Sequence, residues 1–348
     1  MALPDAHFDP DSPATGDTLF GLPHTVEEAA VVVIPVPFEA TTSYRRGTAG
    51  GPEAVRAASG QVDLHDSETG EPWRAGVAME PLDPRIAAWD GAASADARAV
   101  FAAGGLDPDD PDPEIAARCA RVDALSEQVN ALVRERTEAV FARGAIPAIL
   151  GGDHSVPFGA LEAAAARHPG LGILHVDAHA DLRRAYEGFT WSHASIFYNV
   201  MTRIDGIGAL TQVAVRDLGR AETAMAEADP RIAQWLDTRV GWLVEGGEPW
   251  GRIAHRIVQT LPERVWVSFD IDGLDPTLCP STGTPVPGGL SWRETLALLR
   301  VLGESGRRIV GFDLCEVAPG DDEWDAAVGA RLLYKLAGWA IHTLQEAR

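Results

Sequence analysis

Three short segments of the 348-residue sequence carry carboxylate side chains, and two of them also carry an imidazole. They read GGDHS, DAHAD and SFDIDGLDP and lie at 151–155, 177–181 and 268–276. Alternate residues of an extended backbone project to the same side, so the polar groups of DAHAD would share one crevice with the acidic pair of the third segment. The side chains that we expect to converge there are His154, Asp177, His179, Asp181, Asp270 and Asp272.

Four carboxylates and two imidazoles can converge only around a large opposing charge, because repulsion and desolvation would otherwise prevent it. Two divalent cations would supply that charge, and carboxylates can bridge them. Oxygen and imidazole ligands without a thiolate favour Mn²⁺, with Ni²⁺, Co²⁺, Zn²⁺ or Fe²⁺ as alternatives. Taken alone, each segment has another interpretation, as a capped loop, a hydrogen-bonded turn or a calcium-type loop. Together they predict a binuclear metal site.

Each of these segments follows a strand of a predicted α/β fold. Short apolar runs alternate with helix-length amphipathic stretches, which is typical of β-α-β units in a parallel sheet. The expected strands lie at 30–37, 145–150, 172–176, 212–215, 265–271 and 308–314. The expected helices include 115–143, 156–167, 250–260, 292–304 and 325–346. Because ligands bind at the carboxyl ends of parallel strands, the sheet would position the metal site.

The chain contains no linker between two hydrophobic blocks, so we predict one domain over 1–348, with an N-terminal extension at 1–28. The least ordered part is expected within 63–113, as an acidic loop insertion that ends in DPDDPDP. This loop would cover the site or reach a neighbouring subunit, and the sequence does not decide between the two.

Acidic residues dominate the composition, with 51 Asp and Glu against 29 Lys and Arg and a formal net charge of -22. Such a surface repels nucleic acid and anionic membranes and suits small cationic molecules, although it also serves solubility. Three scattered cysteines fit reduced, packed thiols better than disulfides or a zinc knuckle. No apolar run reaches membrane-spanning length and no secretory signal begins the sequence, so we expect a cytoplasmic protein.

These motifs resemble those of the ureohydrolase family, which comprises arginases, agmatinases and related amidinohydrolases with binuclear manganese centres. Besides the three segments above, the matching stretches are TTSYRRGTAGGPEAVR at 41–56, TGTPVPGGLSWRE at 282–294 and DLCEVAP at 313–319. The resemblance implies a three-layer α/β/α sandwich around a mostly parallel sheet, usually assembled into trimers or hexamers.

The resemblance also implies two Mn²⁺ ions per subunit. One ion would be bound by His154, Asp177, Asp181 and Asp270. The other would be bound by Asp177, His179, Asp270 and Asp272. Asp177 and Asp270 would then bridge the ions together with a hydroxide, which attacks the guanidinium carbon of the substrate and releases urea and an amine.

Two further residues match catalytic positions of the family. His193 stands where a histidine shuttles protons, which suits an imidazole near neutral pH. Glu316 matches the carboxylate that receives the guanidinium. We expect Asp153 to orient His154 from behind. The predicted substrate-binding residues are Glu316, Thr284, Trp191 and Arg183.

The loop at 183–191 departs from the usual family pattern, and so do Ala194 and Ala49, which replace a common glycine and a common arginine. The aromatic residues of this loop, Tyr186, Phe189 and Trp191, would either shorten the substrate pocket or only pack the loop itself. If Arg183 or Arg184 faces the cavity, a carboxylated substrate is favoured. If Arg183 instead pairs with Glu187 or lies in solvent, it carries no information on the substrate.

We therefore predict an amidinohydrolase with an agmatine-like substrate. Alternatives within the class are a guanidine hydrolase, a guanidinobutyrase-type guanidino-acid hydrolase, an arginase and a formiminoglutamase, the last of which releases formamide. A non-catalytic partner subunit would have lost metal ligands, and none is lost here. A metallophosphatase-like hydrolase fits the acidic charge poorly. The expected partners are a small cationic guanidino compound and further copies of the chain.

Overall fold

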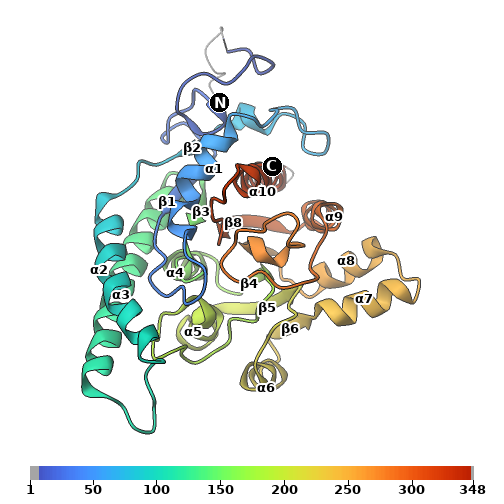
Figure 1. The fold of residues 1–348 in the computed structure, drawn as a ribbon. Coiled ribbons are helices and arrows are strands. Elements are labelled where there is room, and N and C mark those ends of the chain that lie inside the picture. The colour runs from blue at the N-terminus through green and yellow to red at the C-terminus, as the bar shows by residue number, and fades with distance from the viewer. Residues whose placement is uncertain (1–7, 346–348) are drawn as a thin grey trace.

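A parallel sheet of eight strands runs through the middle of the molecule in the computed structural model, which describes residues 8–345 (Figure 1). The strands follow one another across the sheet in the order β2-β1-β3-β8-β7-β4-β5-β6. Their bounds are β1 Val31–Val36, β2 Val77–Met79, β3 Ile146–Gly151, β4 Leu171–Val176, β5 Ile207–Val213, β6 Ile232–Trp235, β7 Arg264–Asp270 and β8 Arg308–Cys315.

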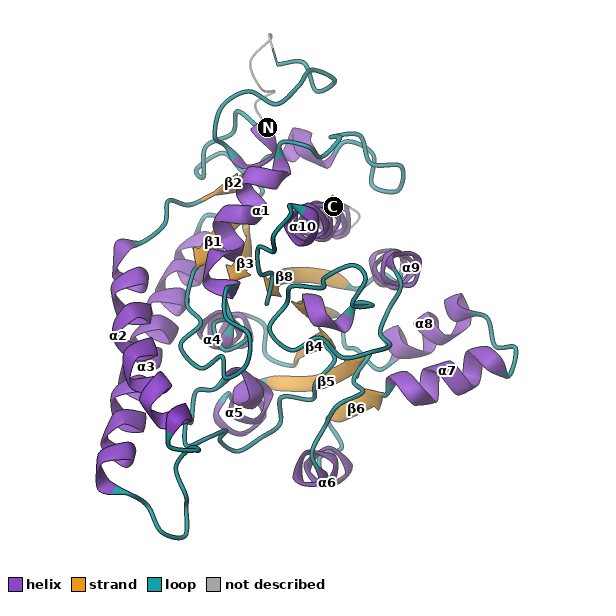
Figure 2. Ribbon diagram, viewed as in Figure 1, coloured by secondary structure: helices purple, strands orange, loops and turns teal. Residues whose placement is uncertain are grey.

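Helices cover both faces of this sheet (Figure 2). Their bounds are α1 Gly51–Ser59, α2 Pro84–Ala102, α3 Pro113–Ala142, α4 Phe158–Arg167, α5 Ile196–Arg203, α6 Arg220–Ala228, α7 Asp237–Glu245, α8 Trp250–Gln259, α9 Trp292–Gly303 and α10 Trp324–Gln345. Helices α1, α8, α9 and α10 pack on one face, and α2, α3, α4 and α5 pack on the other. The predicted three-layer α/β/α sandwich is therefore confirmed.

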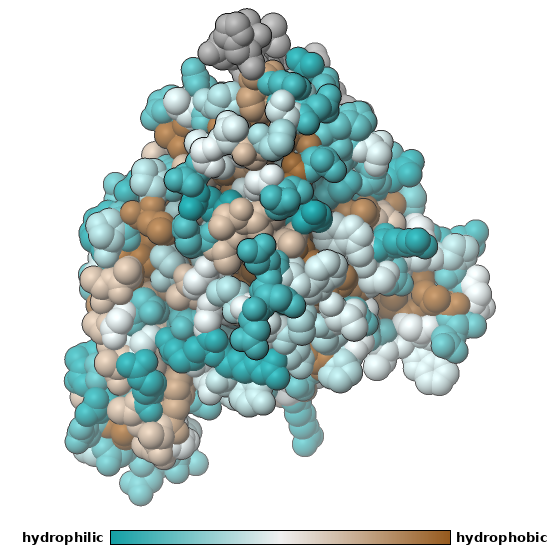
Figure 3. Space-filling view, turned by 45° about the horizontal axis from the view of Figure 1, so that its top comes forward, coloured by the Kyte–Doolittle hydropathy of each residue, from teal (hydrophilic) through white to brown (hydrophobic). Residues whose placement is uncertain are grey.

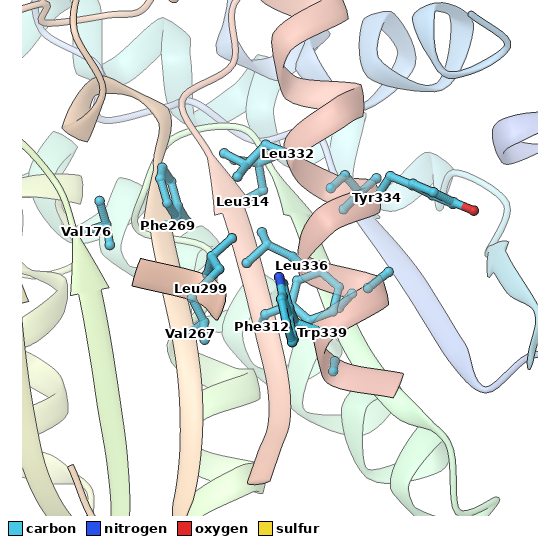
Figure 4. Packing of buried hydrophobic residues seen from close by; sticks show 14 of the residues in the cluster. Val176, Val267, Phe269, Leu299, Phe312, Leu314, Leu332, Tyr334, Leu336 and Trp339 are labelled. Carbon is cyan, nitrogen blue, oxygen red and sulfur yellow. The ribbon is translucent and has the colours of Figure 1, made fainter. Parts of the chain in front are cut away.

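Two hydrophobic layers, one on each face of the sheet, hold the helices in place. Along β1, Val31 and Val33 join one layer while Val32 and Ile34 join the other. A parallel strand that is buried on both faces needs this continuous apolar sequence rather than an alternating one. Figure 4 shows part of the layer that contains Val31 and Val33, at the place where side chains of β7 and β8 meet those of α9 and α10. Phe312 of β8 and Trp339 of α10 lie next to each other there.

Five of the expected strands lie close to their predicted positions, the one expected at 212–215 instead spans 207–213, and two short strands, β2 and β6, were not predicted. Both lie at the edges of the sheet, where a strand needs fewer apolar residues. The segment 63–113 also differs from the expectation, because it contains β2 and the 19-residue α2, with irregular stretches before β2, between β2 and α2, and between α2 and α3. Residues 1–7 of the expected extension, and Glu346 at the end of the expected last helix, lie outside the described residues.

The strand order brings four strand ends together at the centre of the sheet. Strands β3, β8, β7 and β4 are adjacent, although β7 and β8 are the last strands of the chain. No helix among residues 8–345 is long and apolar enough to cross a membrane. On the face shown in Figure 3, hydrophilic residues predominate and hydrophobic ones form small separate groups.

Candidate metal centre

The carboxyl ends of the four central strands carry the predicted chemistry. Asp177 directly follows β4, Asp270 ends β7, and Glu316 directly follows β8. Two glycines let the loops approach one another. A Cβ atom on Gly152 would lie 2.1 Å from the Phe38 carbonyl oxygen. One on Gly273 would lie 2.7 Å from the Asp177 nitrogen, so neither loop tolerates a side chain there.

One group of ligand atoms surrounds the imidazole of His154. Its Nδ1 lies 3.0 Å from Asp177 Oδ2 and 3.3 Å from Asp270 Oδ2. The distance from the same nitrogen to Asp181 Oδ2 is 3.6 Å. All four side chains are buried. One nitrogen and three carboxylate oxygens thus face a common point, an arrangement that can bind a divalent cation.

A second group lies around His179. Its Nδ1 is 3.1 Å from Asp272 Oδ2 and 3.4 Å from Asp177 Oδ1. Asp177 therefore belongs to both groups, with Oδ2 facing His154 and Oδ1 facing His179. This is the geometry of a carboxylate shared between two adjacent cation sites.

Charge in this cluster is strongly unbalanced. Burial and the neighbouring charge of Asp177 raise the pKa of Asp181 well above its usual range. Burial and Asp272 do the same for the pKa of Asp270. Burial alone would lower the pKa of His179, but Asp272 and Asp177 raise it to about 12. The cluster therefore attracts positive charge, and its oxygen and imidazole donors fit two divalent ions.

The outer nitrogen of His154 is oriented by Ser268 rather than by Asp153. Its Nε2 lies 3.0 Å from Ser268 Oγ, which donates to Asp313 Oδ1 at 2.8 Å. The expectation for Asp153 was wrong, because its Oδ1 accepts from Ser155 and its Oδ2 accepts from the loop after β1. The sequence places Asp153 next to His154, but the turn points the carboxylate away from the imidazole.

His175, a buried residue of β4, contacts the shared carboxylate. Its Nε2 lies 2.8 Å from Asp177 Oδ2. Gln212 donates from Nε2 to His175 Nδ1 at 2.9 Å, so His175 carries its hydrogen on Nε2 and donates it to Asp177. His175 thus holds Asp177 in place from the strand side. The contact with Gln212 depends on the pairing of β4 with β5, which local sequence does not reveal.

Two residues near the site adopt a left-handed backbone that is rare without glycine. Asp181 has a φ of 54° and Glu316 a φ of 62°. Such positions cost on the order of 1–3 kcal/mol and persist where the surrounding structure imposes them. Both strained residues carry carboxylates that point into this cluster, which is consistent with a functional site.

Beside the cluster lies a cavity of about 380 Å³. His193 lines it together with His179 and Asp181. Burial and the nearby His179 lower the pKa of His193 to about 4, so its imidazole is neutral at pH 7. A neutral imidazole in this place can accept a proton from a reacting molecule and return it.

Glu316 is buried next to the cluster. Its Oε1 accepts the backbone N–H of His154 at 2.9 Å. Burial and the neighbouring Asp270 raise the pKa of Glu316 well above its usual range. Among residues 8–345, no arginine or lysine forms an ion pair with it. A buried carboxyl group without a cationic partner suits a cationic ligand.

The predicted substrate-binding residues separate in the structure. Thr284 and Arg183 line the cavity, as does Tyr186. Trp191 does not line it, because its ring packs against Phe158 with 4.8 Å between centroids. The loop has an irregular course, so regular spacing could not reveal which aromatic residue faces inward.

Arg183 does not pair with Glu187, in contrast to one expected alternative. Its Nε lies 3.6 Å from Glu222 Oε2, and its guanidinium lies 5.1 Å from the centre of the Tyr186 ring. Arg45, which sequence reasoning did not single out, also lines the cavity and donates to the Pro280 carbonyl.

Comparison with known proteins agrees with this architecture. The model of the arginase family matches residues 29–338. The chain is 32% identical to the N(1)-aminopropylagmatine ureohydrolase of Thermus thermophilus, over 90% of each chain. It is also 32% identical to the proclavaminate amidinohydrolase of Streptomyces clavuligerus, over 96% of each.

Among solved structures, the agmatine ureohydrolase of Thermoplasma volcanium has the same fold. The TM-score is 0.70 at 23% identity, and the match covers 96% of this chain and 97% of that one. The family model spans the three motif segments and all four central strands. The chain therefore belongs to the arginase family of ureohydrolases.

Proposed function

We propose that this protein is a binuclear-metal amidinohydrolase that releases urea and an amine from a guanidino compound. The observation that carries the proposal is the position of Asp177, whose two oxygens face two different ligand groups. The resident ions would be Mn²⁺, with Ni²⁺, Co²⁺ or Zn²⁺ able to replace them. Bound there, two such ions would supply an activated water molecule.

The chain's own residues have separate tasks in this reaction. Glu316 binds the guanidinium of the substrate and holds its carbon beside the cluster. A C–O bond forms to that carbon and the C–N bond to the amine breaks. Neutral His193 accepts a proton from the attacking water and gives it to the leaving nitrogen, so that urea and an amine are the products.

An agmatine-like molecule is the first candidate substrate. The negatively charged Asp217 lines the cavity and would favour the cationic tail of such a molecule. The two named relatives act on different compounds, an aminopropylagmatine and proclavaminate, so the family alone does not select the tail. We also propose that the protein works in the cytoplasm as a homo-oligomer, a trimer or a hexamer.

A guanidino acid is the second candidate, and the position of two arginines favours it. Arg183 and Arg45 both line the cavity. Glu222, the buried acid beside Arg183, already accepts the backbone N–H groups of Leu182 and Gly219 at 3.0 and 2.6 Å. A substrate carboxylate would therefore find cations on two walls of the cavity.

Urea release by protein reconstituted with Mn²⁺, and in parallel with Ni²⁺, tests the proposal. The panel consists of agmatine, arginine, 4-guanidinobutyrate, 3-guanidinopropionate and free guanidine, with formamide measured for formiminoglutamate. Turnover of one guanidino compound supports the function. Absence of turnover in protein with two ions bound per subunit would contradict it and favour the non-catalytic subunit.

The tail of the substrate is tested by Arg183→Met and Arg45→Met. If guanidino acids are the substrates, both variants raise the KM for 4-guanidinobutyrate and leave the KM for agmatine unchanged. Asp217→Asn is the matched variant, because it removes a negative charge from the cavity where the other two remove a positive one. A raised KM for agmatine in that variant alone would favour the agmatine-like substrate.

A further inference from the structure

Thr41 connects His193 to a buried carboxylate that the reaction does not use. It lies in the loop after β1 and is 1% exposed. Its hydroxyl lies 3.0 Å from Asp153 Oδ2 and 3.2 Å from His193 Nδ1. The same oxygen accepts the backbone N–H of His193 at 3.1 Å. One hydroxyl thus contacts both the ring and the backbone of the candidate proton shuttle.

The direction of these hydrogen bonds follows from counting donors. Asp153 accepts the backbone N–H groups of Thr41 and Ser155, at 3.4 and 3.0 Å, and N–H groups can only donate. The Thr41 hydroxyl also donates to Asp153, at its Oδ2 atom. A hydroxyl has a single hydrogen, so the Thr41 oxygen can only accept from His193. The hydrogen of the neutral imidazole then lies on Nδ1.

The other ring nitrogen of His193 remains available to the substrate. His193 lines the cavity, and among the described residues its Nε2 has no hydrogen-bonding partner. With the hydrogen on Nδ1, the Nε2 atom presents a lone pair. In the opposite tautomer, Nε2 would present an N–H group and could not accept a proton.

We infer that Thr41 is a positioning residue that fixes His193 as the Nδ1–H tautomer and turns its Nε2 lone pair toward the substrate. The catalytic consequence rests on the proposed function, but the tautomer does not. Thr41 is absent from the cavity lining, so it acts through His193 and not on the substrate. Its loss is therefore expected to lower kcat and leave KM nearly unchanged.

Three variants separate this role from a structural one. Thr41→Val keeps the shape and removes the hydroxyl, whereas Thr41→Ser keeps the hydroxyl and removes the methyl group. The matched control is Thr42→Val, because Thr42 is also buried and its hydroxyl has no partner among the described residues. We expect Thr41→Val to lower kcat roughly tenfold or more, as for a misdirected acid–base group. Thr41→Ser should restore most of it, and Thr42→Val should match the wild type.

Imidazole ¹⁵N NMR provides a measurement that does not depend on turnover. The protein is loaded with diamagnetic Zn²⁺, metal content is measured, and the His193 signals are assigned by their loss in His193→Gln. We expect the Nδ1–H tautomer in the wild type and in Thr41→Ser, and a mixture in Thr41→Val. An Nε2–H tautomer in the wild type overturns the inference even if Thr41→Val fails to fold. An unchanged kcat in Thr41→Val with two ions bound also overturns it.

The two proposals fail in different ways. If the wild type turns over no guanidino compound while His193 is the Nδ1–H tautomer, the proposed function fails and the positioning by Thr41 stands. If urea is released and His193 has the other tautomer, the proposed function stands and the positioning fails.

Discussion

Asp177 contacts more of the residues in the candidate centre than a single ligand group would require. It faces His154 and His179 with different oxygens, and His175 donates to it from the strand side. Gln212 fixes the second ring nitrogen of His175. Because His175 is held in this way, Asp177 would keep its orientation when ions bind and leave.

The first prediction concerns this shared carboxylate. Asp177→Asn has nearly the same size but lacks the charge that two cations would share, so we expect fewer than two ions per subunit and no urea release. Elemental analysis after dialysis measures the ions. Asp217→Asn is the control for ion binding, because this exposed acid lines the cavity outside both ligand groups. Two ions bound to Asp177→Asn would exclude Asp177 as the bridging ligand.

The second prediction concerns His193. In His193→Asn we expect two ions per subunit and a kcat lowered by roughly 10²-fold or more, as for a lost acid–base group. Steady-state kinetics with metal analysis on the same sample decides the matter. A wild-type rate in this variant would remove His193 from the mechanism.

The sequence placed six charged or imidazole residues together, and the structure brings them together. The reason is that each is tied to a strand end, and strand ends can be found from local apolar patterns. Thr41, Arg45 and His175 were not found as site residues, because their contacts depend on how strands pair and loops fold. Trp191 was predicted to bind the substrate, but it lies outside the cavity and packs against Phe158.

At the scale of elements, two buried helices approach so closely that one glycine is required. Helix α4 packs on α3 at Gly159, where a Cβ atom would lie 2.0 Å from the Asn130 carbonyl oxygen. Because β3 and the loop carrying His154 lead directly into α4, this contact also supports the metal centre.

The third prediction follows from this contact. Gly159→Ala should destabilise the protein by about 1–3 kcal/mol, as overpacking usually does. Gly241→Ala in α7 is the control, because nothing lies within 4 Å of its Cβ position, and it should stabilise by about 0.5–1 kcal/mol through helix propensity. Denaturant unfolding measures both. Equal stability of the two variants would contradict the close packing.

The fourth prediction concerns pH at the end of α4. Burial, with Arg167 nearby, lowers the pKa of His168 to about 4. The unfolded chain therefore binds a proton more readily than the folded protein between about pH 6.5 and 4, so this histidine reduces stability as the pH falls through that window. His168→Gln should lose less thermal stability between pH 7 and 5 than the wild type. An equal or larger loss in the variant would refute the lowered pKa.

Local patterns predicted most of the central strands and the long helices α3 and α10 well, but they missed α2 and the two edge strands. The strand β6 reads IAQW, with two half-buried residues, and β2 has only three residues. Helix α2 was not predicted, because the acidic, proline-rich run DPDDPDP that follows it indicates a loop. The helix nevertheless starts at Pro84, directly after Asp83, whose side chain caps it by accepting the Arg85 backbone N–H.

For the whole molecule, a formal charge of -22 surrounds a cluster that itself attracts cations. The ligand groups come from β3, β4 and β7, so bound ions would link strands that are far apart in the sequence. Metal binding and folding stability would therefore be coupled.

The fifth prediction is a metal-dependent melting temperature. At a free metal concentration of about 100 times the dissociation constant, each ion adds about 2.7 kcal/mol to the free energy of unfolding. For two ions and a chain of this size, the melting temperature would rise by about 5–10 °C. Differential scanning calorimetry of chelator-treated protein, before and after Mn²⁺ is added back, measures the shift. The Asp177→Asn variant should show a smaller one. An unchanged melting temperature in wild type that has regained two ions would contradict the coupling.

The strand order has a consequence for synthesis on the ribosome. Strands β3 and β4 emerge well before β7 and β8, which are made last and which lie between β3 and β4 in the sheet. The nascent chain therefore carries two unpaired sheet edges for much of its synthesis, and such edges invite aggregation. The proposed pair of ion sites would also stay incomplete until residue 272 has left the exit tunnel. Excess negative charge would keep these unfinished chains apart on a crowded polysome.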